Sequence, residues 1–135
     1  MTSEVTYTTE LRTIAVHLQS GNQIITDAPV DNQGKGQAFS PTDLAATSLA
    51  SCMMTIMGIV AQRNGLNIEG TRATVNKIMQ SNPRKIARIE ITLYMPEHTQ
   101  YEDKSRALLE NAARTCPVAL SLHPDIVQEI TFVYP

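Results

Sequence analysis

Hydrophobic and polar residues alternate along the first part of the chain, which is the pattern of strands with one buried face. The alternation runs through residues 4–27, and the turn-forming sequence Ser-Gly-Asn at 20–22 separates the second strand from the third. The next residues, up to Phe39, are rich in Gly, Pro, Asp and Asn. The sequence therefore predicts three strands followed by a loop that is long enough to carry function.

The hydrophobic period changes at Ser40, where a long helix is predicted to begin. Ser40 suits the N-cap, Pro41 the first helical position and Asp43 the third, which gives a capping box with Asp in place of Glu or Gln. Apolar residues then recur every three or four positions until Arg-Asn-Gly at 63–65, which predicts the end of the helix. One face of this predicted helix, 41–62, carries Ala45, Leu49, Cys52, Ile56 and Ile59.

The second half of the chain returns to alternation and then to a helical pattern. Two strands are predicted at 71–80 and 86–95, and the second has one wholly apolar face, formed by Ile89, Ile91, Leu93 and Met95. Residues 96–116 predict a second helix that Pro117 ends or kinks, and a short helical turn and a last strand at 126–135 follow. The order βββ-α-ββ-α-β predicts an α+β fold.

Length and charge narrow the class of protein. With 135 residues the chain is expected to form a single domain, 1–135. A net charge of −2 without a basic cluster argues against a nucleic-acid partner. The first residues lack a basic start followed by an apolar stretch, so we expect a cytoplasmic protein.

The uncharged stretch of the first helix raises the alternative of a membrane span. Residues 44–61 carry no charge over 18 residues, which is near the lower limit for crossing a bilayer. Four of these residues are Ser or Thr, and ordinary helix boundaries of soluble proteins flank the stretch. We therefore favour a buried central helix and expect no membrane partner.

The two cysteines are the candidate chemistry. Cys52 lies in the first predicted helix and Cys116 lies 64 residues later, at the end of the second. They are either two buried, inert thiols or a pair that reaches disulfide distance if the helices pack together. The chain has no Cys-x-x-Cys and no zinc-ligand spacing, so neither a metal nor a cofactor is expected.

These motifs resemble those of the OsmC/Ohr family of thiol-dependent peroxide reductases. The matching segments are SPTDLAATSLASCM around Cys52 and TCPVAL around Cys116, and the spacing between the cysteines agrees with the family. ELRTIAVHLQSG and TDAP near the N-terminus are similar to a divergent OsmC-like subgroup. The resemblance implies an intertwined homodimer with central helices and a role in the stress response against peroxides.

The resemblance also implies a mechanism. Cys52 would attack an organic hydroperoxide, with hydrogen peroxide as a second candidate substrate, and become a sulfenic acid. Cys116 would condense with it to a disulfide, which a dithiol reductant would reduce. An arginine from an N-terminal strand assists the thiolate in the family, and Arg12 is the best candidate here.

The carboxylate that positions this arginine departs from the family pattern. The best-studied members carry Glu ten residues before the first cysteine, and this chain has Thr42 there and Asp43 next to it. One helical step is about 100° of rotation, so Asp43 either replaces that Glu or serves only the capping box. A different brace for the arginine is the third possibility.

Two other functions remain open. An OsmC-fold protein could bind a small hydrophobic ligand without turnover, which the loss of the family Glu at Thr42 would favour. A redox sensor could instead use a Cys52–Cys116 disulfide to change a partner surface, although no sequence feature favours it.

Overall fold

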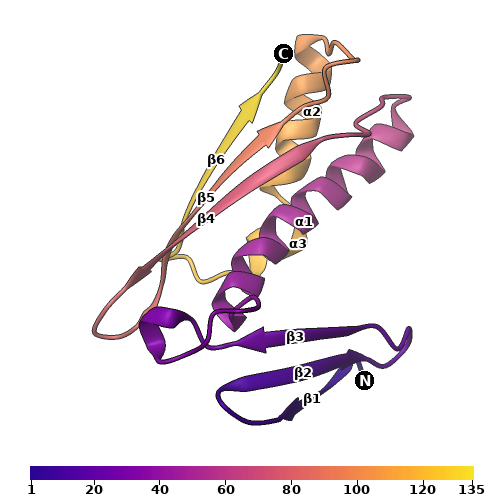
Figure 1. Ribbon diagram of the computed structural model, residues 1–135. Helices are drawn as coiled ribbons and strands as arrows, with labels where there is room; N and C mark the ends of the chain where they lie inside the picture. The colour runs from indigo at the N-terminus through magenta and orange to yellow at the C-terminus, as the bar shows by residue number, and fades with distance from the viewer. The chain divides into compact units, whose positions relative to one another are not determined.

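Two three-stranded sheets and two long helices make up the fold, which is described for residues 1–135 by a computed structural model. Its elements follow in the order β1-β2-β3-η1-α1-β4-β5-α2-α3-β6 (Figure 1). The predicted α+β class and strand order are therefore confirmed, α3 takes the place of the predicted short helical turn, and the short helix η1 is added. The chain divides into two compact units, residues 1–45 and 46–135, and the boundary falls inside α1.

The first unit is an antiparallel meander. Its strands are β1 (Ser3–Tyr7), β2 (Arg12–His17) and β3 (Gln23–Asp27), and β2 lies in the middle. Gly21 turns the chain between β2 and β3 with a φ of +76°, a conformation that favours glycine. The resulting register places Arg12 directly opposite Asp27.

The loop after β3 folds back onto the end of that strand. It contains the short 3-10 helix η1 (Val30–Asn32), and the Gly36 N–H donates to the Ala28 carbonyl over 3.3 Å. Only glycine fits at position 34, because a Cβ there would lie 1.7 Å from the Ala28 carbonyl oxygen. The predicted long loop is thus an ordered segment with a defined path back to Phe39, whose carbonyl accepts the Asp27 N–H.

This first unit buries almost nothing apolar. Its buried side chains are polar, namely Thr26, Asp27 and Ser40. Its exposed large hydrophobic side chains come from the strands, their turns and the loop: Val5, Tyr7, Leu11, Leu18, Ile24, Ile25, Val30 and Phe39. Apolar side chains gathered in this way on one small sheet are typical of a surface that another part of an assembly covers.

Helix α1 (Pro41–Arg63) begins where its capping box predicts. The Ser40 N–H donates to Asp43 Oδ2 over 3.0 Å, and the Asp43 N–H donates to Ser40 Oγ over 3.0 Å. By length and hydropathy alone α1 could cross a membrane, a criterion that core helices of soluble proteins also meet, and a third of its most apolar window is buried within the chain.

The buried face of α1 differs from the predicted stripe. Of that stripe only Leu49 is fully buried, and Ile59 is 40% exposed. The helix instead buries Ala46, Leu49, Ala50, Met53, Met57 and Ala61. The reason is that α1 is apolar and uncharged on most sides, so periodicity alone does not distinguish the side that meets the core.

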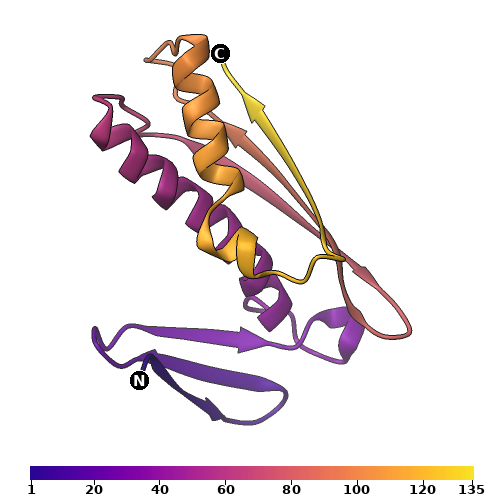
Figure 2. The same cartoon turned by 180° about the vertical axis from the view of Figure 1, so that it is seen from behind.

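The second unit is a sheet covered on one face by helices. Strand β5 (Lys85–Tyr94) lies between β4 (Arg72–Gln80), which is antiparallel to it, and β6 (Val127–Val133), which is parallel. Figures 1 and 2 together place α2 (Asp103–Arg114) and the part of α1 beyond Ala45 on the same face of this sheet. The predicted apolar face of β5 is confirmed, since Ile89, Ile91, Leu93 and the following Met95 are buried.

The second helix is shorter than predicted. It begins at Asp103 rather than at residue 96. The preceding residues are held by backbone groups distant in sequence: His98 bonds the Glu69 carbonyl over 3.0 Å and the Tyr101 hydroxyl donates to the Asn67 carbonyl. Tertiary contacts thus override the helical composition there.

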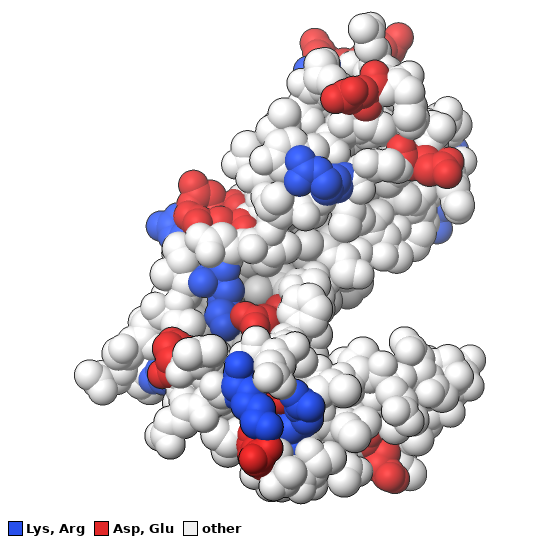
Figure 3. All heavy atoms as spheres, in the orientation of Figure 1, with Lys and Arg blue, Asp and Glu red and all other residues white.

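Pro117 starts a new helix as well as ending the old one. Helix α3 (Pro117–Ser121) has this proline at its first position, where the missing N–H costs nothing. The break between α2 and α3 leaves Cys116 as the N-cap residue with an extended backbone, φ −66° and ψ 153°. On the face that Figure 3 shows, basic and acidic side chains are interspersed on a mainly uncharged surface.

Candidate functional site

The two cysteines come together inside the second unit. Cys52 lies in the middle of α1 and is half-buried, whereas Cys116 lies between α2 and α3 and is fully buried. Both are free thiols, and the Cys116 side chain is within hydrogen-bonding reach of Cys52. The packing of the helices therefore brings together residues that are 64 positions apart in the sequence.

The environment of Cys116 favours its protonated form. Burial raises the pKa of the Cys116 thiol, and the neighbouring Cys52 adds to the rise. The backbone N–H groups of Ala119 and Val118, in the first turn of α3, oppose this by lowering the pKa. A Cys116 thiolate would therefore find hydrogen-bond donors already in place, although the apolar surroundings disfavour its charge.

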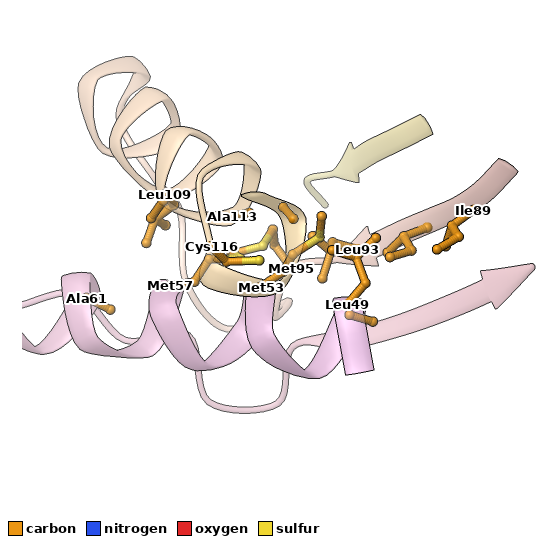
Figure 4. Close-up of a cluster of buried hydrophobic side chains, with 14 of the residues drawn as sticks. Leu49, Met53, Met57, Ala61, Ile89, Leu93, Met95, Leu109, Ala113 and Cys116 are labelled. Carbon is orange, nitrogen blue, oxygen red and sulfur yellow. The ribbon is translucent and has the colours of Figure 1, made fainter. Parts of the chain in front are cut away.

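Those surroundings are sulfur-rich and aliphatic. Figure 4 shows Cys116 within the cluster of buried side chains contributed by α1, α2 and β5. Met53 and Met57 are fully buried in this cluster, so two of the three methionines of α1 fill the core. Cys52 and Met54 pack at its edge and are only partly buried. Of the two thiols, Cys52 is therefore the one with access to solvent.

Arg12 is held by a carboxylate that the sequence analysis did not identify. Its Nε donates to Asp27 Oδ1 over 2.7 Å and its Nη2 donates to Asp27 Oδ2 over 2.8 Å, a two-bond arrangement that fixes the guanidinium plane. The hydrogen bond from Arg12 lowers the pKa of Asp27 despite the opposing effect of burial, and the same bond raises the pKa of Arg12. Both groups are therefore charged near neutral pH.

Gln37, in the loop after β3, forms one hydrogen-bonded cluster with Arg12 and Asp27. Its side-chain oxygen accepts a hydrogen bond from Arg12 Nη2 over 3.2 Å, and its backbone N–H donates to Asp27 Oδ2 over 3.2 Å. An ion pair between Lys35 and Glu10 lies close enough to influence the same charges, since Lys35 contributes to lowering the pKa of Asp27 and Glu10 to raising that of Arg12.

The four predicted site residues divide between the two units. Arg12 and Asp43 belong to residues 1–45, and Cys52 and Cys116 to residues 46–135. Within the first unit, the described bonds of the Asp43 carboxylate and N–H are those of the capping box, with Thr42 adding a 3.2 Å contact to the Ser40 hydroxyl. No group of three or more His, Cys, Asp or Glu side chains is arranged to hold a metal ion.

The sequence alone does not single out Asp27. Counting outward from the centre of the Ser-Gly-Asn turn at 20–22 would place Arg12 opposite Val30, whereas the observed register pairs Val16 with Gln23 and Arg12 with Asp27. Because the count from the turn is three residues off, only the structure identifies Asp27 as the acid that faces Arg12.

Comparison with known proteins places these residues in a family. The family of OsmC-like proteins matches residues 34–131 of the chain. The crystal structure of a candidate osmotic stress induced and detoxification response protein from Psychrobacter arcticus 273-4 is 54% identical, with a TM-score of 0.94 over 98% of this chain and 96% of that chain. No curated protein matches the sequence.

More distant structures share the fold. An organic hydroperoxide resistance protein OsmC from Legionella pneumophila is 17% identical, with a TM-score of 0.72 over 98% of this chain and 96% of that one. An organic hydroperoxide resistance protein from Elizabethkingia anophelis, crystallised with thiocyanate bound, is 15% identical, with a TM-score of 0.76 over 100% and 97%. At these identities the likeness concerns the fold.

Proposed function

Because the chain belongs to the OsmC-like family, we propose that it is a thiol-dependent peroxidase that reduces organic hydroperoxides. The observation that carries this proposal is the contact between the half-buried Cys52 and the buried Cys116 in the second unit. Two adjacent thiols that differ in solvent access suit a two-step reaction. The more accessible thiol reacts with the peroxide, and the buried thiol then forms a disulfide with the oxidised one.

The first step oxidises Cys52. Its thiolate attacks the distal oxygen of the hydroperoxide, the O–O bond breaks, and the alkoxide takes up a proton and leaves as an alcohol. Cys52 is then a sulfenic acid, and the peroxide has received two electrons. Cys52 suits this step because it lies at the edge of the apolar cluster, where a substrate with a hydrocarbon part gains by leaving water.

The second step uses Cys116. Its sulfur attacks the Cys52 sulfur, the disulfide bond forms, and the sulfenic hydroxyl leaves as water with the proton that Cys116 gives up. The N–H groups of Val118 and Ala119 support the negative charge that develops on Cys116 as it loses this proton. A dithiol reductant then supplies two electrons and two protons and restores both thiols.

Arg12 is the proposed partner of the Cys52 thiolate. An unassisted cysteine has a pKa of about 8.5, so a positive, hydrogen-bonding group is needed to hold the thiolate at neutral pH. The Arg12 guanidinium is charged and held in one orientation, and its side chain is 32% exposed, which leaves it able to meet a further group. Asp43 is proposed to fix the start of the cysteine helix through the capping box.

A homodimer is the proposed working form. The exposed hydrophobic side chains of the first unit and the uncharged exposed positions of α1, Ser48, Ser51, Thr55 and Ile59, support it, because both surfaces would be covered by a second copy. Light scattering after gel filtration tests this, and a monomer at micromolar concentration would contradict it.

The peroxidase proposal is tested by intact mass. Reduced protein receives one equivalent of tert-butyl hydroperoxide and then an alkylating agent, beside the Cys116→Ser and Cys52→Ser variants. We expect the wild type to lose both free thiols within seconds, Cys116→Ser to stop at one added oxygen, and Cys52→Ser to remain reduced. Repeating the titration with hydrogen peroxide shows whether this substrate is also accepted.

Binding of a small hydrophobic ligand without turnover is the second candidate. It is favoured by Thr42, which stands where the best-studied relatives carry the glutamate that braces their arginine. Full alkylation of both cysteines after minutes with peroxide, together with an apolar ligand retained through purification, would put this function in first place.

A further inference from the structure

Within the first unit, the side chain of Arg12 is hydrogen-bonded to Asp27 of β3 and to Gln37 of the loop that follows it. We propose that Asp27 and Gln37 are positioning residues that orient Arg12 for peroxide reduction and take the place of the glutamate found before the cysteine in the best-studied relatives. This inference rests on the proposed function for its catalytic meaning. The influence of the two residues on how Arg12 acts on Cys52 can be measured separately from peroxide reduction.

The bonding pattern determines which edge of the guanidinium is available. Asp27 takes one N–H from Nε and one from Nη2, and Gln37 takes another from Nη2. The described bonds are thus made by Nε and Nη2, and Nη1 has none of them. A thiolate or a peroxide oxygen would therefore meet the same pair of N–H groups each time.

Asp27 is the residue of the cluster that is best suited to hold Arg12 in place. Its side chain is 1% exposed and receives three hydrogen bonds, two from Arg12 and one from the Gln37 N–H. It lies opposite Arg12 in the β2–β3 ladder, so the backbone itself sets the separation of the two groups. An acid anchored in this way holds a long side chain that would otherwise sample many rotamers.

Gln37 adds a contact without adding charge. A carboxylate in its place could still accept the hydrogen bond from Arg12 Nη2, but it would put a second negative charge on the same guanidinium. The positive potential that Arg12 offers to a thiolate would then fall. Replacing Gln37 by Glu is therefore an almost isosteric change that separates the electrostatic role of this residue from its packing.

The backbone path of the loop also supports the positioning role of Gln37. The bend at Gly34 and the bond between Gly36 and Ala28 bring the loop back to the end of β3, where the Gln37 N–H reaches Asp27. Gln33 lies four residues earlier in the same loop and is also exposed, and it has no bond to Arg12 or Asp27. Gln33→Glu thus makes the same change of net charge away from the cluster and serves as the matched control.

The experiment uses the full-length protein and three variants: Asp27→Asn, Gln37→Glu and Gln33→Glu. Two quantities are measured: the second-order rate at which tert-butyl hydroperoxide oxidises Cys52, and the pH midpoint for alkylation of Cys52 by iodoacetamide. Thermal unfolding midpoints report whether a variant is merely less stable. A structural role alone would change the unfolding midpoint and leave the pH midpoint of Cys52 where it is.

We expect Asp27→Asn to slow oxidation about 10- to 100-fold, since a misplaced catalytic group costs on that order. Gln37→Glu should slow oxidation and raise the pH midpoint of Cys52 by roughly one unit, because a negative charge near the site disfavours the thiolate. Gln33→Glu should match the wild type within about twofold. If Asp27→Asn does not fold, the exposed loop variant Gln37→Glu still decides the question.

Two failures can be told apart. If the wild type consumes peroxide and Gln37→Glu has the same oxidation rate and pH midpoint, the positioning role is wrong and the peroxidase proposal stands. If the wild type consumes no more peroxide than Cys52→Ser, the peroxidase proposal is wrong. The alkylation midpoint then still tests the cluster: a shift in Gln37→Glu but not in Gln33→Glu supports it, and equal midpoints overturn it.

Discussion

Brief treatment of the reduced, folded protein with iodoacetamide should modify Cys52 and leave Cys116 unmodified. Cys116 has an exposed fraction of 0% and lies in a cluster with Met57 and Leu109, which are also fully buried. To admit a reagent, the packing around it must open and expose at least two such large side chains. Each costs about 1.5–3 kcal/mol to expose, which sums to roughly 3–6 kcal/mol.

Such an opening is rare. Since about 1.4 kcal/mol corresponds to a factor of ten, Cys116 would be accessible in only about 1 in 100 to 1 in 10,000 molecules. Burial also raises the pKa of Cys116, which reduces the share of reactive thiolate further. Half-buried Cys52 needs no such opening, so its alkylation should be at least about 100-fold faster.

The assay is peptide mapping by mass spectrometry of samples quenched over a time course. Cys116→Ser should reproduce the fast phase and Cys52→Ser the slow one. Unfolding in guanidinium chloride should bring the two rates together, which controls for any intrinsic difference between the peptides. If Cys116 in the native protein reacts within tenfold of Cys52, the packing that we describe around it does not protect it, and its assignment as the shielded, resolving thiol would have to be given up.

Three further predictions concern stability. Leu109→Ala should lower the free energy of unfolding by about 2–5 kcal/mol because it leaves a cavity in the core, whereas Leu120→Ala, at a side chain 72% exposed, should change it by less than about 0.5 kcal/mol in the same urea titration. Asp43→Ala should cost about 0.5–2 kcal/mol in urea unfolding, since the Ser40 N–H loses its acceptor at the start of α1; no change would mean that the capping box is dispensable. Arg12 lowers the pKa of Asp27, so this carboxylate contributes stability that is fully present above its unfolded pKa of about 3.9 and is lost as pH falls through the lower folded pKa. The difference in unfolding midpoint between the wild type and Asp27→Asn should therefore narrow below about pH 4. A difference that stays constant with pH would contradict this.

Local signals in the sequence predicted most of the fold. The capping box at Ser40 and the alternation through β5 depend on neighbouring residues only, and the structure agrees with both. The start of α2 depends on His98 and Tyr101 reaching the carbonyls of residues 67 and 69, and such contacts leave no periodic trace. Periodicity likewise did not indicate which side of α1 the chain itself buries, because the apolar surface of this helix extends around it.

The candidate site was predictable in part. The cysteines stood out by their rarity and their motifs, but only the packing of α1 against the α2–α3 break places one beside the other. The resemblance indicated Arg12, and the family pattern pointed to Asp43, at the start of the helix, as the nearest match for its carboxylate. Strand register, which relates residues across a turn rather than along the chain, was the information needed to identify Asp27.

The pairing of Arg12 with Asp27 also limits how this hairpin can evolve. Side chains on a strand alternate between two faces, so inserting or deleting one residue in the turn between β2 and β3 would send one member of the pair to the opposite face. Exposed turns normally tolerate changes of length well. In close relatives that keep both residues, this turn should therefore vary in sequence while its number of residues stays constant.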